Sequence, residues 1–244
     1  MILSNEHLRV VIVNNWIMSI EYLTEDFLFP FAYIDYENRM KPRGGSHPCF
    51  PNFGPAPTNY SGLPQHGYLR NQIPKVLHTN SYKVSLYSRV GGTKSYPWEI
   101  DCMTEFRILD KTVIIKCILS RSDELEEKAP FNLGMHNYWN NPNGISNNIN
   151  GLNLPDRFRD TVKRAKQIQW NETNGPVILE IADIGKVKMS MESEGKNQIV
   201  VWSDDPRFLC FEQVIDDPIR FGTKSGLHLE SHDLFEAEFT LNFS

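Results

Sequence analysis

The sequence is poor in alanine and has no long apolar run, and each shortage excludes a class of protein. Only six of its 244 residues are alanine, the strongest helix former, whereas valine, isoleucine and threonine together number 43. This composition predicts an all-β protein. No stretch approaches the roughly 18 to 20 apolar residues that a membrane-spanning helix needs. We therefore expect no membrane partner.

An excess of basic charge and closely spaced cysteines are also missing. The formal net charge is −5, and the charges are interspersed, so we expect no nucleic-acid partner. No CxxC pair suggests a zinc or redox site, because the four cysteines are widely separated (Cys49, Cys102, Cys117 and Cys210). The segment MILSNEHLRVVIV at the start has an acidic residue where a secretory signal would be basic. These features favour reduced, buried thiols and a cytoplasmic protein.

Standard catalytic signatures are absent as well. The sequence has no GxGxxG before a helix, no Walker loop, no GxSxG elbow and no HExxH. The candidates for catalytic residues are therefore isolated histidines and carboxylates and not the residues of a local motif.

The pattern that is present is alternation of apolar and polar residues from end to end. It is clearest in four segments: 83–88, 99–109, 186–193 and 236–243. Such segments are typical of half-buried antiparallel strands, and the more continuously apolar 113–119 and 199–202 indicate central strands. Turn residues, including Gly91-Gly92, separate them. No linker divides the chain, so residues 1–244 are predicted to form one all-β domain, a large sandwich or barrel.

Two stretches interrupt the alternation. Residues 41–71 are rich in proline and glycine, and a connection this long inside a domain is usually functional or disordered. Residues 132–153 are rich in asparagine and carry His136, Tyr138 and Trp139. Turn chemistry explains the asparagines. The alternative is a polar cleft lined by aromatic residues that holds a sugar.

Three titratable residues lie in unusual local sequence. His66 stands between Gln65 and Gly67, and His136 follows an apolar run. Glu212 interrupts the strand-like segment LCFEQV, where an isolated carboxylate is unfavourable unless it is paired or functional. Each residue taken singly also fits a structural role.

The order of short motifs along the chain carries more information than any of them alone. They are PRGG at 42–45, CFPNFGP at 49–55, GLPQHGYLRN at 62–71, YPWEI at 96–100, PFNLGMHNYW at 130–139 and LCFEQV at 209–214. This series resembles the hexose-6-phosphate mutarotase (glucose-6-phosphate 1-epimerase) branch of the aldose 1-epimerase family. The resemblance implies a large antiparallel β-sandwich, the galactose mutarotase-like supersandwich, with the sugar site in a cleft across one sheet.

The resemblance also implies roles for single residues. His136 matches the family's general acid and Glu212 its general base. The remaining matches are to substrate-binding residues: Arg43, Gln65, His66, Arg70 and Asp160. Among these, His66 holds sugar hydroxyls and the two arginines favour a phosphorylated substrate.

The activity that the resemblance implies is interconversion of the α and β anomers of a hexose 6-phosphate. It requires no cofactor and no metal, only one acid and one base on opposite sides of the sugar ring, with Glu212 ionised and His136 protonated. The sequence departs from the family after RGG, where it reads Ser-His-Pro in place of an apolar-Pro-apolar segment. Two alternatives therefore stay open: an aldose 1-epimerase acting on free hexoses, and a carbohydrate-binding relative without catalysis.

Overall fold

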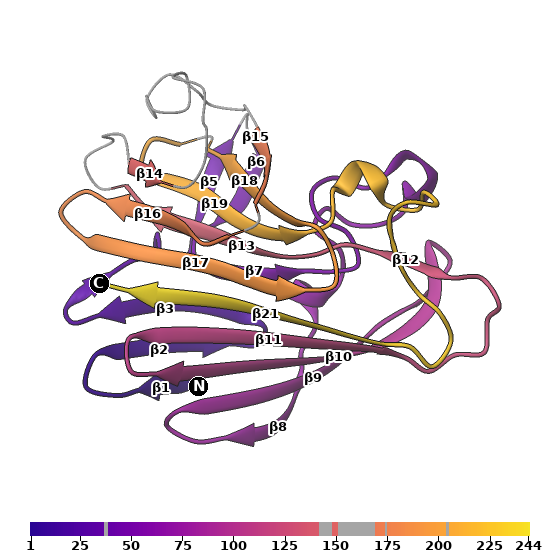
Figure 1. Ribbon diagram of the computed structural model, residues 1–244, viewed down its shortest axis with the longest axis horizontal. Helices are drawn as coiled ribbons and strands as arrows, with labels where there is room; N and C mark the ends of the chain where they lie inside the picture. The colour runs from indigo at the N-terminus through magenta and orange to yellow at the C-terminus, as the bar shows by residue number, and fades with distance from the viewer. Residues whose placement is uncertain (37–38, 142–147, 151–168, 174, 204) are drawn as a thin grey trace.

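Two large antiparallel sheets account for most of the chain in the computed structural model, which describes residues 1–36, 39–141, 148–150, 169–173, 175–203 and 205–244. The sheets lie against each other as two layers (Figure 1). The described residues contain strands and short 3-10 turns but no α-helix, and therefore no helix that could cross a membrane. The expectation of a large antiparallel β-sandwich is confirmed.

The first sheet has nine strands and contains the centre of the candidate site. Its order is β1 (Ile2–Ser4), β2 (Leu8–Val13), β3 (Trp16–Tyr22), β7 (Ser46–Cys49), β13 (Leu133–Asn140), β19 (Phe208–Ile215), β18 (Asn197–Trp202) and β15 (Gln169–Glu172), with β4 (Glu25–Asp26) beside β3. Strands from the two halves of the chain thus meet at its middle, where β7 pairs with β13.

The second sheet has eight strands. Its order is β14 (Asn148–Asn150), β16 (Val177–Ile181), β17 (Gly185–Ser193), β21 (Leu234–Phe243), β11 (Thr112–Arg121), β10 (Tyr96–Leu109), β9 (Lys83–Thr93) and β8 (Lys75–Thr79). Burial alternates strictly along β10 and β11, because one face packs on the first sheet and the other meets solvent. The alternating segments of the sequence correspond to β9, β10, β17 and β21.

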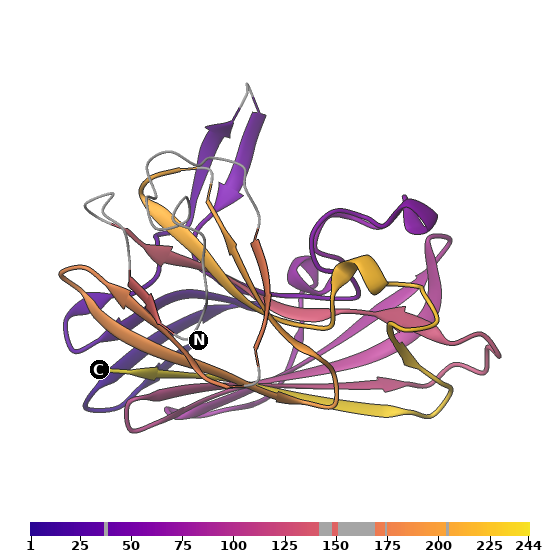
Figure 2. The same cartoon turned by 45° about the horizontal axis from the view of Figure 1, so that its top comes forward.

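Two small two-stranded sheets complete the described part of the fold. Strands β5 (Ala32–Tyr36) and β6 (Arg39–Arg43) form a hairpin that projects from the body of the protein (Figure 2). Strand β12 (Ala129–Phe131) pairs with β20 (Leu227–Leu229). The 3-10 turns among the described residues are η1 (Thr58–Tyr60), η2 (Leu69–Asn71) and η5 (Pro218–Arg220).

Both stretches that interrupt the alternation contain a central strand, so the interpretations of 41–71 as one long connection and of 132–153 as turns were wrong. Strand β7 lies inside 41–71, and β13 lies inside 132–153. All of β7 and nearly all of β13 is buried, so neither strand shows the alternation of a half-exposed one. Gly91-Gly92 was likewise predicted to separate strands but lies within β9, next to an irregularity in the β9–β10 pairing.

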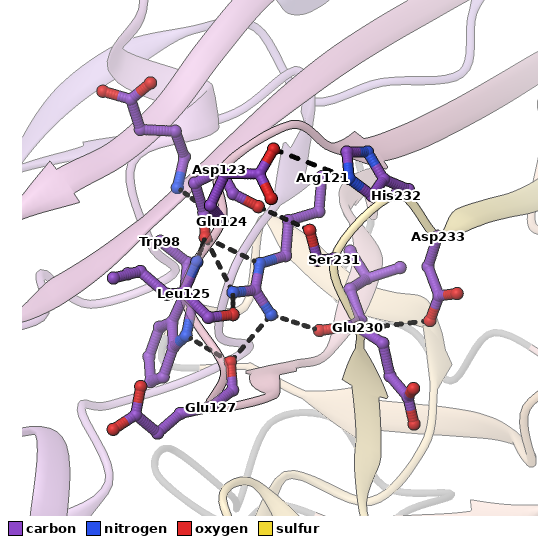
Figure 3. A network of polar contacts seen from close by, with 12 residues as sticks. Trp98, Arg121, Asp123, Glu124, Leu125, Glu127, Glu230, Ser231, His232 and Asp233 are labelled. Carbon is purple, nitrogen blue, oxygen red and sulfur yellow. Dashed lines mark hydrogen bonds and ion pairs between the residues drawn. The ribbon is translucent and has the colours of Figure 1, made fainter.

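A buried arginine fixes the connection between β11 and β12 (Figure 3). The Arg121 side chain is 0% exposed and donates to Asp123 Oδ1 from Nε at 3.0 Å and from Nη2 at 2.7 Å. Its other donors bind the backbone oxygens of Leu125, Glu127 and Leu229. All five guanidinium hydrogens are thereby used, so this charge is structural.

Candidate active site

The site lies on the face of the nine-stranded sheet that points away from the other sheet. Odd-numbered residues of β13 and β19, such as Met135 and Phe211, belong to the core between the sheets together with Ile115 of β11. The even-numbered residues of the same strands therefore point to the opposite face.

Strand register brings polar residues into one row across that face. His47 of β7 is directly opposite His136 of β13. The β13–β19 register, in which Met135 faces Gln213 and Tyr138 faces Cys210, places His136 opposite Glu212. His47, His136 and Glu212 thus occupy adjacent strands, although they are far apart in the sequence.

His136 and Glu212 are in contact and almost fully buried. His136 Nδ1 lies 3.1 Å from Glu212 Oε1, and the two side chains are 4% and 3% exposed. The contact falls outside the angular range of a hydrogen bond, and among the described residues neither atom has another hydrogen-bond partner. The expectation of an acid and a base on opposite sides of the sugar ring was therefore wrong, because two groups in contact act from the same side. The pair is close enough to exchange protons with one bound molecule and has donor and acceptor capacity left for it.

Burial shifts both members of the pair toward their uncharged forms. It raises the pKa of the Glu212 carboxyl well above its usual value. Burial also lowers the pKa of His136, and the neighbouring His66, His47, Arg70 and Arg43 lower it further. The sequence interpretation assumed an ionised glutamate and a protonated histidine. The surroundings of the pair instead favour the neutral arrangement, in which the shared proton is on the Glu212 carboxyl group and not on the His136 ring.

Aromatic rings surround His136. It stacks on Tyr138, with ring centroids 4.5 Å apart, and on Phe53 at 6.2 Å. The ring of His66 meets it nearly edge-on at 4.7 Å, and that of Trp202 at 6.3 Å. Rings of this kind offer apolar faces, and the imidazoles add polar atoms, which is the usual composition of a site for a small polar ligand.

The segment 50–71 supplies one wall of the site. The His66 backbone has φ of +63°, and its N–H donates to Gly54 O at 2.8 Å while its Nδ1 accepts the Gly54 N–H at 3.2 Å. Since Nδ1 is an acceptor, the proton of neutral His66 is on Nε2, where it can be donated to a ligand. The Gln65 amide nitrogen beside Nε2 is then in contact with it without a hydrogen bond. Gly67 follows with φ of +70°, and a Cβ there would lie 2.1 Å from Phe50 O. This explains why glycine follows the histidine in the motif.

Arg70 extends from the same segment toward His47. Its Nη2 donates to Gln65 O at 3.0 Å, and its Nη1 lies 3.4 Å from His47 Nε2. Its Nε is buried and has no hydrogen-bond partner among the residues that the structure describes. Gln65 Nε2 lies 3.3 Å from His66 Nε2, so Gln65, His66 and Arg70 form one group.

Arg43 reaches the site from the end of β6. Its guanidinium lies over the Trp202 ring at 5.3 Å, and Nη1 donates to Pro42 O. The two glycines that follow allow the chain to turn closely into β7, since a Cβ on Gly44 would lie 2.3 Å from Pro30 O. Both Arg43 and Arg70 lower the pKa of His66, which burial and these charges bring to about 3.

The structure thus brings six of the seven predicted site residues into one region: Arg43, Gln65, His66, Arg70, His136 and Glu212. Asp160 lies outside the described residues. Sequence reasoning did not assign His47 or Cys210 to the site. Once β7 and β13 are known to be neighbours, the motif SHPC places His47 beside His136, but the resemblance gave no such hint, because relatives have an apolar segment there.

Comparison with known proteins agrees with this architecture. The family model for aldose 1-epimerase matches residues 15–169. A protein of Escherichia coli (strain K12), named as a candidate glucose-6-phosphate 1-epimerase, is 31% identical over 150 residues, and a Salmonella typhimurium protein of the same name is 31% identical over 152 residues. Each match covers 59% of this chain and 47% of the relative, so it spans about half the length of those relatives.

Solved structures share the fold at low sequence identity. A Synechocystis sp. PCC 6803 protein has a TM-score of 0.80 at 16% identity, and the match covers 100% of this chain and 95% of the other. A galactose mutarotase related enzyme from Lactobacillus acidophilus has a TM-score of 0.73 at 16% identity, with 100% and 97% covered. Since the aldose 1-epimerase model matches more than half of the sequence and the fold is that of the mutarotase-like structures, the chain belongs to the aldose 1-epimerase family.

Proposed function

We propose that this protein interconverts the α and β anomers of a hexose 6-phosphate. The observation that carries the proposal is the buried contact between His136 and Glu212, with two arginines close enough to act on the same imidazoles. The relatives named as glucose-6-phosphate 1-epimerases support the choice of reaction and of a phosphorylated substrate.

The reaction needs one proton shared between two groups. One member of the pair takes the proton of the C1 hydroxyl while the other gives its proton to the ring oxygen O5. The C1–O5 bond breaks, the aldehyde turns about C1–C2, and the ring closes on its other face with the transfers reversed. A neutral pair, with the carboxylic acid as donor and the imidazole as acceptor, supplies the same proton as the charged pair. Each positioned group contributes about 10²–10⁴-fold to the rate.

The other predicted residues would hold the sugar. His66 Nε2–H is a donor for a hydroxyl oxygen, and Gln65 lies beside it. Arg70 and Arg43 would bind the phosphate, since guanidinium groups pair with phosphate oxygens in a bidentate manner.

The proposal can be tested by measuring anomer exchange at equilibrium. Proton exchange NMR on glucose 6-phosphate and on glucose, with wild-type protein, with Glu212→Gln protein and without protein, gives the catalysed rate for each sugar. We expect faster exchange of the phosphosugar with wild-type protein only. Equal acceleration of both sugars would assign the protein to free hexoses, and line broadening from binding without exchange would identify a carbohydrate-binding protein.

A further inference from the structure

A thiol lies next to the proposed acid–base pair. Within the described part of the chain, His136, Cys210 and Glu212 each offer a ligand atom, and these atoms all lie within 4.8 Å of one another. All three side chains are buried. A set of one nitrogen, one sulfur and one oxygen donor is chemically suited to Zn²⁺ and to similar borderline divalent ions.

The backbone holds the three donors in place. Cys210 and Glu212 are two residues apart on β19, so they point to the same face, and His136 lies opposite on the neighbouring strand β13. Both strands are in the middle of the nine-stranded sheet. In a tetrahedral zinc site the ligand atoms are about 3.3–3.6 Å apart, given metal–ligand distances of about 2.0–2.3 Å. The donors, all within 4.8 Å of one another, must therefore come closer by about 1 Å to reach that spacing.

Two of the donors are buried without a satisfied hydrogen bond. His136 Nδ1 and Glu212 Oε1 face each other at 3.1 Å outside hydrogen-bonding geometry, and in the residues described they have no other hydrogen-bond partner. Buried polar atoms in this condition are costly, and each such atom in a native protein needs an explanation. A ligand that accepts lone pairs from both at once would satisfy them.

We propose that His136, Cys210 and Glu212 form a binding site for one zinc-like divalent cation, which competes with the sugar. On binding, the Cys210 thiol and the Glu212 carboxyl group each give a proton to solvent, so that a thiolate and a carboxylate balance the two positive charges. These two negative charges are needed, because the guanidinium groups of Arg43 and Arg70 oppose a cation. A fourth coordination position stays available to water.

The expected consequence is reversible inhibition. An ion bound to His136 and Glu212 occupies the lone pairs that proton transfer requires, so anomer exchange stops while the metal is bound. This consequence rests on the proposed function, whereas the binding of the ion does not. The two can therefore be tested separately.

Cobalt titration of the reduced, metal-free protein tests the binding. Co²⁺ takes the same ligands as Zn²⁺, and a thiolate ligand gives a charge-transfer absorption band. We expect one Co²⁺ per chain with this band, displaced by Zn²⁺. Cys210→Ser and Cys210→Ala should lose the band, and Cys117→Ser, which changes a buried thiol in the other sheet, should keep it.

A second thiol provides the decisive comparison. Cys49 Sγ lies 3.4 Å from His66 Nδ1 and 3.6 Å from His47 Nδ1, so it belongs to a neighbouring set of donors. We expect Cys49→Ser to keep the cobalt band. A band that survives in Cys210→Ser, or wild-type protein that shows no band, would overturn the proposal.

Two measurements on the wild-type protein avoid dependence on how the variants fold. X-ray absorption of the zinc-loaded protein should show one sulfur neighbour and light-atom neighbours, and a shell without sulfur would overturn the assignment. Glucose 6-phosphate should raise the concentration of Co²⁺ needed for half-saturation, and unchanged cobalt binding at saturating sugar would contradict competition. If the protein lacked mutarotase activity, the proposed function would be wrong, but the cobalt band would still show whether the ion binds at this site.

Discussion

The imidazole rings of His47 and His136 stack across the β7–β13 ladder, with centroids 5.0 Å apart and planes inclined by 28°. Both side chains are buried, and His47 Nε2 lies 3.4 Å from Arg70 Nη1. A proton on either ring would therefore be held without water and near other positive charge. Burial and the charge of Arg70 and His66 lower the pKa of His47 well below its usual value, and His136 is shifted in the same direction.

This arrangement predicts loss of stability in mild acid. An unfolded chain takes up protons on histidine below about pH 6.5, whereas folded His47, His66 and His136 resist protonation, so stability falls as the pH drops from about 6.5 toward 3. The raised pKa of Glu212 acts in the opposite sense, since its contribution is lost as the pH rises. Urea unfolding at pH 7, 6 and 5 should give a free energy of unfolding that decreases with the pH, because three histidines lower it and only Glu212 acts against them.

Replacing one of the stacked rings isolates its contribution. The unfolded chain then takes up one proton fewer than in the wild type. His47→Gln should therefore reduce the slope of the unfolding free energy against pH by about 1.4 kcal/mol per pH unit below pH 6. The matched control is His78→Gln, the same change at an exposed histidine of β8. Equal pH dependence in wild type and His47→Gln would mean that His47 titrates in the folded protein as it does in the unfolded chain.

The acid–base pair makes a second prediction, on rate. Glu212→Gln keeps the shape of the side chain and His136→Asn keeps a polar group, and each should lower kcat for anomer exchange by at least about 10²-fold. The double variant should lose less than the product of the two losses, because the groups act as a unit. Glu238→Gln, the same change on a partly exposed residue of β21, is the control. A folded Glu212→Gln protein with the wild-type rate would end the proposed mechanism.

The sequence predicted the eight-stranded sheet better than the nine-stranded one, for a physical reason. Strands such as β10 and β11 meet solvent on one face, so their residues alternate visibly. Strands β7 and β13 are buried on both faces. The side chains on their outward face line the candidate site and do not meet solvent, so polar and apolar residues do not alternate. Their local sequence therefore lacks the strand pattern and resembles loops.

The candidate site was predicted by its motifs but not by its geometry. The order of motifs selected His66, His136 and Glu212, yet nothing in their spacing shows that His136 and Glu212 are cross-strand neighbours, because strand order depends on the whole sheet. His47 was missed for the same reason. Its place depends on the β7–β13 register, which local patterning does not contain.

Arg121 gives a prediction on stability. Arg121→Met would remove five hydrogen bonds to Asp123 and three backbone oxygens, although Asp123 and Glu127 O each keep another N–H donor. Breaking a buried pair in this way costs about 3–5 kcal/mol of unfolding free energy. Arg9→Met, which breaks the partly exposed pair of Arg9 with Glu21, should cost about 0–1 kcal/mol. Urea unfolding of both variants gives the comparison, and a similar small loss in both would show that the network of Figure 3 contributes little.

Arg70 gives the prediction on substrate choice. If its guanidinium binds the phosphate, Arg70→Ala should raise KM for glucose 6-phosphate by one to two decades, as expected for a charge-assisted hydrogen bond of about 1.5–3 kcal/mol. Exchange of free glucose should change little, and added sulfate should inhibit the wild-type reaction with the phosphosugar because it competes for the same donors. Arg70→Lys keeps the charge but not the bidentate geometry, so its KM should lie between those of wild type and Arg70→Ala.

The control for Arg70 is Arg89→Ala. This change removes an arginine that pairs with Asp101 in the eight-stranded sheet, so KM for either sugar should stay at the wild-type value. Arg70 also lies against His47, and its removal therefore has a structural effect that must be separated from loss of phosphate binding. The ratio of kcat/KM for the two sugars does this, because a disturbed His136 lowers both values together, whereas a lost phosphate contact lowers only that for glucose 6-phosphate. Equal losses for both sugars in Arg70→Ala would make Arg70 a positioning residue for the imidazoles and remove the argument for a phosphorylated substrate.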